Sequence, residues 1–569
     1  MRPRAAPDRR YNRRPDIGRS RCWVSAGRRD YFHNTVLIGC LTLVSRLLGV
    51  ARDSVCAGYF GAGAVWDAFS FAFRVPNLFR NLLGEGALSA ALIPVFTQYL
   101  ELKERREAWR LAWVVITATA AALLACLLLG EGLLLAIPWL REVSERWRLT
   151  LALTAVLLPY MVFICLTAVA GGLLNCLKHF AAPAISPVLL NGIWIVAVVL
   201  VGPAVATDAA SRAFVLGVGI LVAGLFQLLL QVAVLLKRGM PLEPAFELRH
   251  PGLRQVAVTM APVVAGMAAF QVNVLLDGVI AIAFSANERA QTFGLFGAQI
   301  HYPMLVGANS VLYYGNHLMQ FPLGVFGVAL ATAVFPILSS RAALKDWGGF
   351  SEATSDGLGA VLFIGLPAGV GMIVLRQPAV ELLFERGAFT AEMSQRTAIV
   401  LAAYSTGMWA YCAQHVLTRA FYSLQDSVTP AKLAGAMVAL NLVLNLCLIW
   451  PLREAGLAAA TAFSAAVQTF ILYAILARRV PLTGQKRLLT TAVKTLLATA
   501  VMSAACLAAL SAVPPRPASD DLTVKTMRVV IPLLAGTCAY VCAAVLLGVP
   551  EMNLLVNWLK RTLKPGQRR

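Results

Sequence analysis

The stretch LGVGILVAGLFQLLLQVAVLL at residues 216–236 contains 21 residues without a single charge. A helix of about 20 apolar residues crosses the hydrocarbon layer of a bilayer, so this stretch predicts a membrane-spanning helix. The whole chain has the same character, since 59% of its 569 residues are hydrophobic and only 14% are charged. A soluble domain has about a quarter of its residues charged. The composition excludes a soluble enzyme, a nucleic-acid-binding domain and a disordered chain, and predicts an all-α polytopic membrane protein.

Fourteen apolar spans are predicted along the chain, with boundaries good to a few residues. They are residues 31–50, 65–97, 111–138, 150–177, 184–202, 213–236, 256–284, 309–337, 357–375, 396–422, 430–450, 455–477, 490–512 and 527–548. The second span is too long for one straight crossing, and it contains Pro76, Gly84, Gly86 and Pro94. We therefore expect a bent or broken helix there.

Basic residues set the expected orientation of these spans. The net charge of +21 would suggest a nucleic-acid partner in a soluble protein, but lysines and arginines gather in the cytoplasmic loops of membrane proteins. With the N-terminus inside, the cytoplasmic connections carry more than twice as many lysines and arginines as the opposite connections. An even number of spans then places both termini in the cytoplasm, including the basic tail 551–569.

The first 30 residues are rich in arginine and contain no apolar run. We expect a disordered basic tail at 1–30 rather than a signal peptide, because the apolar stretch that follows contains Arg46 and has no small-residue cleavage site. A start codon assigned too early would mean that part of this tail is not made.

Cysteine and histidine do not form a recognisable site. Eleven cysteines are scattered without a CxxC pair, and six histidines are dispersed without metal-ligand spacing. No nucleotide-binding GxxxxGK[ST] loop appears either. We therefore expect no bound cofactor and no ATP hydrolysis by this chain.

Charged side chains occupy positions in the first two spans that a bilayer should exclude. They are Arg46, Asp67, Arg74, Arg80 and Glu85, with Arg52 and Asp53 just beyond the first span. Each charge near the centre of a spanning helix costs about 2.5–3.5 kcal/mol, so such residues either line a substrate path or pair with one another between helices. Asp67, Arg74 and Asn81 recur every seven residues and share one helical face. Because arginines are in excess, and because guanidinium binds phosphate oxygens in pairs, this set favours a phosphate or diphosphate ligand.

A second polar set lies in later spans. Asp277 stands alone in the seventh span, without a basic neighbour within two helical turns of the sequence. Asn441 and Asn445 lie one turn apart in the eleventh span, and Thr461 lies in the twelfth. One carboxylate, two amide oxygens and a hydroxyl suit a hard cation such as Na⁺. Polar side chains that hydrogen-bond between helices would give the same spacing, and both interpretations stay open on the residues alone.

Two other polar features carry no predicted function. Arg419 lies near the cytoplasmic end of the tenth span, where its side chain can reach the headgroups. The stretch from His301 to Ser310 is expected to form a surface loop.

Several segments resemble a known family. SRLLGVARD (Ser45–Asp53), WDAFSFAFRVPNLFRNLLGEGALSAALIPVF (Trp66–Phe96) and YYGNHLMQFPLGVFGVALATAVFPILS (Tyr313–Ser339) resemble the MurJ (MviN) lipid II flippases. FYSLQDSVTP (Phe421–Pro430) is similar to the segment after that family's tenth span. The family belongs to the multidrug/oligosaccharidyl-lipid/polysaccharide exporter superfamily. The resemblance covers about residues 31–550, and its RxxGxxRD and PNLxRxxxxEGA elements are specific to the flippases.

The resemblance implies a domain organisation. Two pseudo-symmetric six-helix lobes would surround a central cavity, with an N-lobe at 31–240 and a C-lobe at 250–480. Two further helices at 488–550 would form a groove for the polyprenyl tail of the substrate.

The resemblance also implies substrate-binding residues. They are Arg46, Arg52 and Arg80 and the acidic Asp67 and Glu85. The predicted substrate-binding set also includes Arg74, from the charge pattern described above, and Asn77 in the same span. In the eighth span this chain has His317 where the family commonly has an arginine, and Gln320 at a position that is Glu in some members. Histidine is neutral half or more of the time near pH 7. Either the diphosphate depends more on the first two spans here, or this step is pH-sensitive.

The activity implied is that of a transporter, not an enzyme. It would move lipid II, the undecaprenyl-diphosphate-linked disaccharide-pentapeptide, from the inner to the outer leaflet of the bacterial inner membrane by alternating access. The membrane potential, a cation gradient or both would drive it, and the Asp277 set resembles a sodium site proposed for some members. A monomer is expected, with membrane lipids and, by resemblance only, cell-wall synthases as neighbours.

Three alternatives stay open. One is an exporter of another polyprenyl-linked glycan or of a cationic drug, although a drug exporter should have acids rather than three arginines in its cavity. Another is a membrane enzyme acting on lipid-linked sugars, for which we find no nucleophile or metal-binding cluster. The third is a scaffold that kept the fold without transport.

Overall fold

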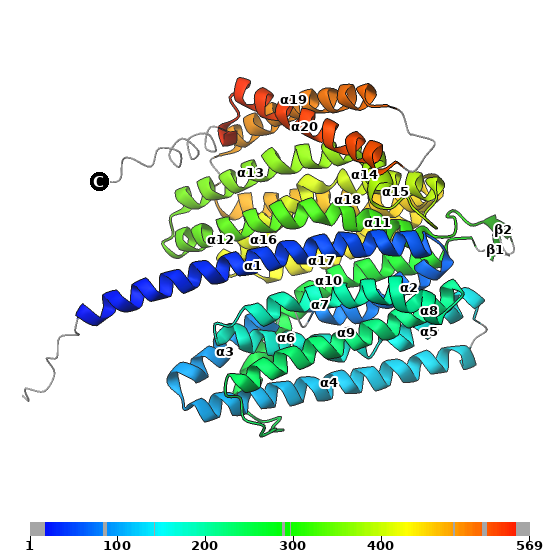
Figure 1. Cartoon of the computed structure of the whole chain (residues 1–569). Helices are drawn as coiled ribbons and strands as arrows, with labels where there is room; N and C mark the ends of the chain where they lie inside the picture. Colours follow the sequence, from blue (N-terminus) through cyan, green and yellow to red (C-terminus); the bar gives the residue numbers. More distant parts are fainter. Residues whose placement is uncertain are drawn as a thin grey trace, which may run out of the picture.

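The computed structural model describes residues 17–82, 88–140, 143–286, 291–295, 298–481, 484–514 and 521–552. From residue 39 onward it also describes their side chains, except those of residues 88–90, 139–140, 262, 265–266, 270, 295 and 298. Within these ranges the chain is helical apart from one short β-hairpin. Figure 1 shows most helices running side by side, roughly parallel to one long direction. Glu85, residues 1–16 of the expected N-terminal tail, and most of the C-terminal tail lie outside the described residues.

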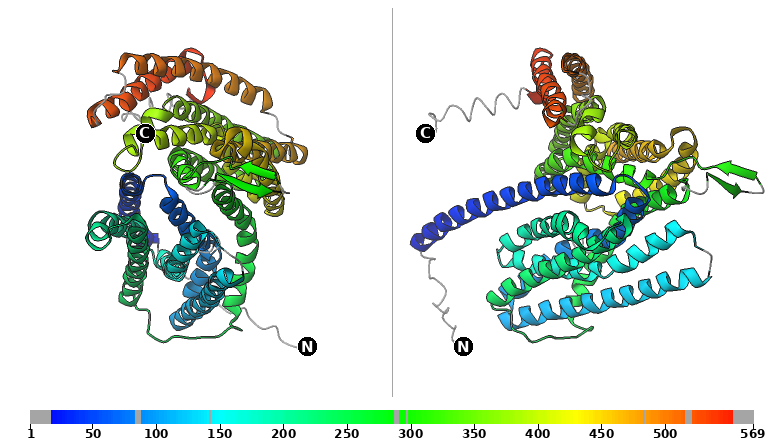
Figure 2. Two further views of the ribbon diagram at one scale, coloured as in Figure 1. Left: turned by 90° about the vertical axis from the view of Figure 1, so that its right-hand side faces the viewer. Right: turned by 45° about the vertical axis from the view of Figure 1, so that its right-hand side comes forward.

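The first group of helices packs mainly within itself. It comprises α1 (Ile17–Phe60), α2 (Ala64–Phe79), α3 (Leu88–Leu102), α4 (Arg105–Leu140), α5 (Glu145–Leu157), α6 (Tyr160–Cys176), α7 (Ala181–Val196), the π-helical turn η2 (Ala197–Val201), α8 (Gly202–Val205) and α9 (Ala209–Lys237). Helix α1 packs on α7, α2 on α5, and α9 on both α6 and α7. Figures 1 and 2 place α1 along the boundary between this group and the next.

The second group follows a long connection. It comprises α10 (Pro251–Ala283), β1 (Thr292–Leu295), β2 (Ala298–His301), α11 (Ala308–Pro322), the π-helical turn η3 (Leu323–Gly327), α12 (Val328–Ala343), α13 (Trp347–Val374), α14 (Arg376–Leu383), α15 (Ala391–Ser405), α16 (Met408–Ser423), α17 (Val428–Leu452) and α18 (Glu454–Arg479). Helix α10 packs on α17 and also contacts α2 and α3 of the first group. The strands β1 and β2 pair antiparallel, with Thr292 opposite His301.

The last two helices, α19 (Gln485–Ala512) and α20 (Leu522–Leu546), pack on each other, and α19 packs along α13. A small core holds them there, formed by Met502, Cys506, Tyr540 and Ala544 with Phe363 of α13. Figure 1 shows this pair at the edge of the molecule, beyond the second group.

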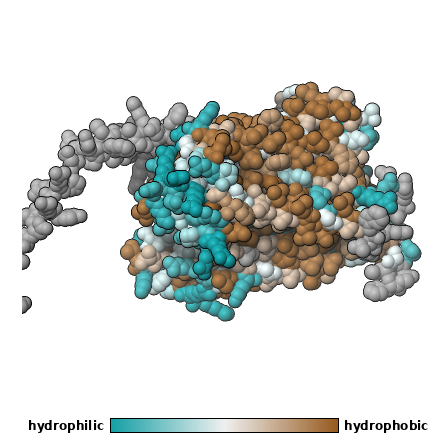
Figure 3. Space-filling view, turned by 90° about the horizontal axis from the view of Figure 1, so that it is seen from below, coloured by the Kyte–Doolittle hydropathy of each residue, from teal (hydrophilic) through white to brown (hydrophobic). Residues whose placement is uncertain are grey.

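The two ends of the bundle differ, and we name them by what they carry. The hairpin end carries the turn between α1 and α2, the β1–β2 hairpin and α14, and the tail end carries the start of α1 and the loop between α12 and α13 (Figure 1). Figure 3 shows a wide apolar surface between these ends, with hydrophilic residues gathered mainly at the tail end. An apolar surface of this kind is what contact with lipid requires.

Ten helices among the described residues are long and apolar enough to cross a membrane. They are 105–138, 145–176, 181–205, 209–237, 308–343, 347–374, 428–452, 454–479, 485–512 and 522–546, and each overlaps one predicted span. The polytopic all-helical class is therefore confirmed. The total of fourteen spans and the pseudo-symmetric lobes stay predictions.

Three local expectations have clear outcomes. The predicted break in the second span is confirmed, because α2 ends at Phe79, a π-helical turn covers 80–82, and a separate helix begins at Leu88.

By contrast, α1 begins at Ile17, so residues 17–30 are helical rather than disordered. Each residue that extends an existing helix adds one backbone hydrogen bond. Arginine is a good helix former, so the arginine-rich segment can continue the helix of the first span. The expected surface loop 301–310 is also shorter than predicted, because α11 begins at Ala308.

Candidate functional site

Arg52 at the end of the first predicted span is held by a network between α1 and α7. Its Nη2 lies 2.7 Å from the Oδ1 of Asp53, and its Nη1 donates to the Oδ1 of Asn191 at 3.1 Å. The guanidinium also lies 4.6 Å from the centre of the Trp194 ring. Asn191 in turn donates to the carbonyl of Ser45 at 3.1 Å. Arg52 is therefore oriented by an ion pair, an amide and an aromatic face together.

Asp53 connects this network to α11. The hydroxyl of Tyr313 donates to its Oδ1 at 3.3 Å, and the centres of the His317 and Tyr313 rings lie 4.0 Å apart, with the ring planes tilted by 38°. The Nδ1 of His317 lies 2.9 Å from the carbonyl oxygen of Tyr313. A carbonyl oxygen only accepts, so Nδ1 carries a proton and Nε2 is left for another partner. The structure thus links His317 to Arg52 through Tyr313 and Asp53, and substrate binding by both residues stays a prediction.

Arg46 and Arg74 lie against glycines of the second helix group. A Cβ atom at Gly324 in η3 would come within 3.0 Å of both terminal nitrogens of Arg46, and one at Gly278 in α10 would come within 2.7 Å of Nη1 of Arg74. Neither guanidinium forms an ion pair or hydrogen bond with any other residue in the described ranges. Two partly buried arginines that form no ion pair within the described ranges favour an anionic ligand.

Arg80 and Asn77 lie at the end of α2, where the helix changes to a π-helical turn. Arg80 interacts electrostatically with the buried Cys165 of α6. The Oδ1 of Asn77 is buried and has no hydrogen-bond partner among the described residues. A buried acceptor left unpaired is costly, so Asn77 has capacity for a donor from a ligand.

Asp67 has a different environment from the arginines. Its side chain is fully buried and lies 2.9 Å from Nη2 of Arg146 on α5. It also accepts from the backbone N–H groups of Gly307 at 2.9 Å and Ser310 at 2.7 Å, and from the hydroxyl of Ser310 at 2.7 Å. Both carboxylate oxygens thus have protein donors at the start of α11. The expected stripe of Asp67 and Arg74 is divided between two environments, and substrate binding by Asp67 stays a prediction.

The predicted cation set does come together. The Nδ2 of Asn445 donates to Asp277 at 2.6 Å and to the Oδ1 of Asn441 at 2.8 Å. The hydroxyl of Thr461 donates to the other oxygen of Asp277 at 3.4 Å. Exchanging the oxygen and nitrogen of the Asn441 amide would let it donate to Asp277 at 3.2 Å and to Asn273 at 2.9 Å. Helices α10, α17 and α18 therefore supply one cluster of polar side chains around a buried carboxylate.

This cluster suits a hard monovalent cation better than a transition metal. Carboxylate, amide and hydroxyl oxygens are hard ligands. No group of three or more His, Cys, Asp or Glu residues able to hold a metal ion occurs in the described ranges. The amide oxygen of Asn445 is buried without a hydrogen-bond partner in that part of the chain, so it has free capacity for a cation.

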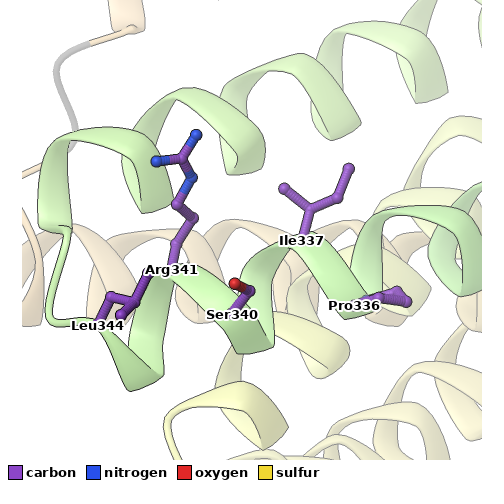
Figure 4. Close-up of a pocket in the computed structure, with 5 residues that line it drawn as sticks. All are labelled: Pro336, Ile337, Ser340, Arg341 and Leu344. Carbon is purple, nitrogen blue, oxygen red and sulfur yellow. The ribbon is translucent and has the colours of Figure 1, made fainter. Parts of the chain in front are cut away.

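An open pocket of about 380 Å³ lies elsewhere, near the end of α12 (Figure 4). Its lining residues are Pro336, Ile337, Ser340, Arg341 and Leu344. Figure 4 shows Arg341 extending toward α13, and its guanidinium pairs with Asp346 at 2.6 Å. None of the predicted site residues lines this pocket, and the arginine of the pocket already has an anionic partner.

Several residues of these sites were missed by sequence reasoning. They are Arg146, Asn191, Trp194, Asn273, Ser310 and Tyr313. Asn191 and Asn273 are polar residues inside predicted spans, and the rule that identified Asp277 would have found both. The other four are ordinary in loops, helix ends or cores, and their sequence positions give no comparable signal.

The fold and these sites define a polytopic membrane transporter with two groups of polar side chains in its helices. One is an arginine cluster, Arg46, Arg52, Arg74 and Arg80, and the other is the polar cluster around Asp277. Among solved structures, a lipid II flippase MurJ in an inward closed conformation superposes with a TM-score of 0.68 at 22% identity, covering 90% of this chain and 98% of that chain. An inward-facing MATE-family multidrug resistance transporter of the MOP superfamily superposes with a TM-score of 0.60 at 13% identity, covering 80% of this chain and 98% of the other.

Sequence comparison identifies the family. The profile of the family "Lipid II flippase MurJ" matches residues 56–516. A probable lipid II flippase MurJ of Vibrio cholerae is 32% identical over 450 residues, covering 77% of this chain and 81% of that protein. A lipid II flippase MurJ of Burkholderia cenocepacia is 29% identical over 466 residues, covering 79% and 84%. The chain belongs to the MurJ family.

Proposed function

We propose that this protein is a lipid II flippase, a transporter rather than an enzyme. The observation that carries the proposal, beside family membership, is the pair Arg46 and Arg74, two partly buried guanidinium groups that form no ion pair within 4.0 Å in the described ranges. A diphosphate supplies the paired oxygens that guanidinium groups bind best. The substrate would be the undecaprenyl-diphosphate-linked disaccharide-pentapeptide. A cationic drug, the substrate of a multidrug exporter, would be repelled by the same arginines.

We infer a mechanism of alternating access between two six-helix lobes, α1–α9 and α10–α18. Arg46, Arg52 and Arg80 would collect the diphosphate from the inner leaflet, with Arg74, Asn77 and His317 beside them. The contacts at the hairpin end support a state closed on that side. There Asp67 and Arg146 join α2 and α5 to α11, and the carbonyl of Gly58 accepts from the N–H of Ala388 at 2.8 Å. Transport would require these contacts to separate.

The expected energetics favour export. Two negative charges moving outward across an inside-negative potential go downhill by about 4.6 kcal/mol per 100 mV. Na⁺ bound at Asp277, Asn441, Asn445 and Thr461 would be the coupling ion. The cluster geometry given above supports this assignment, and hydrogen bonding between helices is the alternative to it.

The remaining features complete the proposal. Helices α19 and α20 would hold the polyprenyl tail. The protein would lie in the bacterial inner membrane as a monomer with both termini in the cytoplasm, so the hairpin end would face outward. Membrane lipids would surround it, cell-wall synthases would be its neighbours, and no nucleic acid would bind. Na⁺ would be its only bound ion, without another cofactor.

Genetic rescue tests this function. A bacterium depleted of its own lipid II flippase would receive the wild type, Arg46→Ala, Arg80→Ala or Asp277→Ala, with growth and outer-leaflet lipid II as readouts. We expect rescue by the wild type, loss with either arginine variant, and loss or slowing with Asp277→Ala. Arg341→Ala serves as the control, because that arginine already pairs with Asp346. If a well-expressed, correctly inserted wild type failed to rescue growth, the substrate would be another polyprenyl-linked glycan and not lipid II.

A further inference from the structure

Arg74 of the arginine cluster lies beside the proposed cation site. Its Nη1 would be 2.7 Å from a Cβ at Gly278, the residue directly after Asp277 on α10. The charges of Arg74 and Asp277 interact with each other. Tyr404 on α15 interacts electrostatically with both. The two proposed sites are therefore adjacent, although they were recognised separately in the sequence.

The contact between these two charges is incomplete. In the described ranges Arg74 has no ion pair within 4.0 Å, while Asp277 is occupied by the neutral donors Asn445 and Thr461. Arg74 thus lies close enough for its charge to be attracted by the carboxylate, but it forms no ion pair with it. A long side chain in this position can turn either toward Asp277 or toward a ligand in the arginine cluster.

Glycine at position 278 leaves room for the guanidinium of Arg74. A Cβ there would also come within 3.0 Å of the ring of Phe71, so the space beside Asp277 is just large enough for the guanidinium. Arg74 comes from α2 of the first helix group and Gly278 from α10 of the second. The contact therefore crosses the boundary between the two groups that must move during alternating access.

We propose that Arg74 is shared between Asp277 and the substrate diphosphate, so that Na⁺ at Asp277 and diphosphate at the arginine cluster favour each other's binding. Without Na⁺, the buried carboxylate attracts the guanidinium toward α10. With Na⁺ bound, the carboxylate is neutralised and the guanidinium is repelled by a like charge. Arg74 is then available to the diphosphate. Because such coupling is reciprocal, diphosphate must also tighten Na⁺ binding by the same factor.

The test uses the full-length protein in lipid nanodiscs, with undecaprenyl diphosphate as the probe. This inference rests on the proposed function, so the affinity is measured in Na⁺ and in choline at equal ionic strength. We expect the wild type to bind the probe at least about fivefold more tightly in Na⁺. Arg74→Gln should bind equally in both salts. Arg80→Gln should bind more weakly in both salts but keep the wild-type ratio.

A second readout separates this role from a merely structural one. Without the probe, Arg74→Gln should bind Na⁺ more tightly than the wild type, since a competing cation has been removed. Gly278→Ala keeps all charges but displaces the guanidinium, and it should reduce the salt ratio.

The outcomes distinguish the two proposals. Arg74→Gln that keeps the full wild-type ratio overturns the sharing of Arg74. Probe binding by the wild type that is indifferent to Na⁺ also overturns it but leaves the flippase proposal intact. If the folded wild type does not bind the probe at all, both the sharing of Arg74 and the flippase proposal are overturned.

Discussion

The carboxylate of Asp67 on α2 and the guanidinium of Arg146 on α5 lie 2.9 Å apart at the hairpin end of the bundle. The same carboxylate accepts hydrogen bonds from the start of α11, and the same guanidinium donates to the hydroxyl of Ser285 after α10 at 2.7 Å. One ion pair of the first helix group is thus tied to two segments of the second. This relationship makes the pair a candidate for the contact that must open during transport.

Replacing Arg146 should weaken closure of the hairpin end. Arg146→Ala leaves Asp67 as a buried carboxylate without its counter-ion, a change that typically costs about 3–5 kcal/mol. We expect a lower Tm and faster labelling of a cysteine at Ser70, which is buried behind the pair, by an impermeant maleimide added from outside.

The controls for this prediction are Arg148→Ala and a double variant. Arg148→Ala, on the same helix, should leave labelling unchanged. Asp67→Asn combined with Arg146→Ala should recover part of the Tm, because no unpaired charge stays buried. Equal labelling in Arg146→Ala and Arg148→Ala would contradict the assigned role of the pair.

Arg52 should not tolerate lysine. Its guanidinium contacts Asp53, Asn191 and the face of Trp194 at once, and an ammonium group cannot reproduce that planar arrangement. We expect Arg52→Lys to lose rescue of the depleted bacterium and most undecaprenyl diphosphate binding. Trp194→Leu should weaken binding several-fold, since a cation–π contact is worth about 0.5–2 kcal/mol. Arg376→Lys, an exposed substitution on α14, is the matched control. Rescue by Arg52→Lys at wild-type level would show that charge alone suffices.

Much of the fold follows from the sequence because bilayer crossing demands long uncharged helices. The same demand makes Asp277, Asn441 and Asn445 conspicuous, since a polar side chain in an apolar helix needs a partner. Their convergence is therefore predictable. The break after Phe79 is predictable too, from the length of the span and its prolines.

The partners of Asp67 and Arg74 are not predictable in this way. Two donors to Asp67 are backbone N–H groups, which carry no side-chain signature. Arg146 lies in the first turn of a helix, where arginines are ordinary. Asp277 has no basic neighbour near it in sequence, yet Arg74 is beside it in space, because α2 and α10 meet only in the folded chain.

Acid should weaken one contact at the tail end. Burial alone would raise the pKa of Asp426, but hydrogen bonds from Thr429 and the ion pair with Arg479 lower it to about 2. An unfolded aspartate has a pKa of about 3.9, so the folded state gains stability above that pH and loses it as the pH falls toward 2. The Tm difference between wild type and Asp426→Asn should be constant from pH 7 to 5 and shrink below about pH 4. A difference that already shrinks between pH 7 and 5 would contradict this origin.

Sodium should stabilise the protein through Asp277. A ligand that binds only the folded state stabilises it by about 2.7 kcal/mol at one hundred times its Kd. We expect Na⁺, but not choline at the same ionic strength, to raise the Tm of the wild type. Asp277→Asn keeps the size and most hydrogen bonds of the side chain but removes the charge, so the Na⁺ effect should disappear. Asn316→Ala, in a pair with Gln320 on α11, is the control and should keep it. A Tm that rises equally with Na⁺ in wild type and Asp277→Asn would mean that the cluster only joins α10 to α17 and α18 by hydrogen bonds.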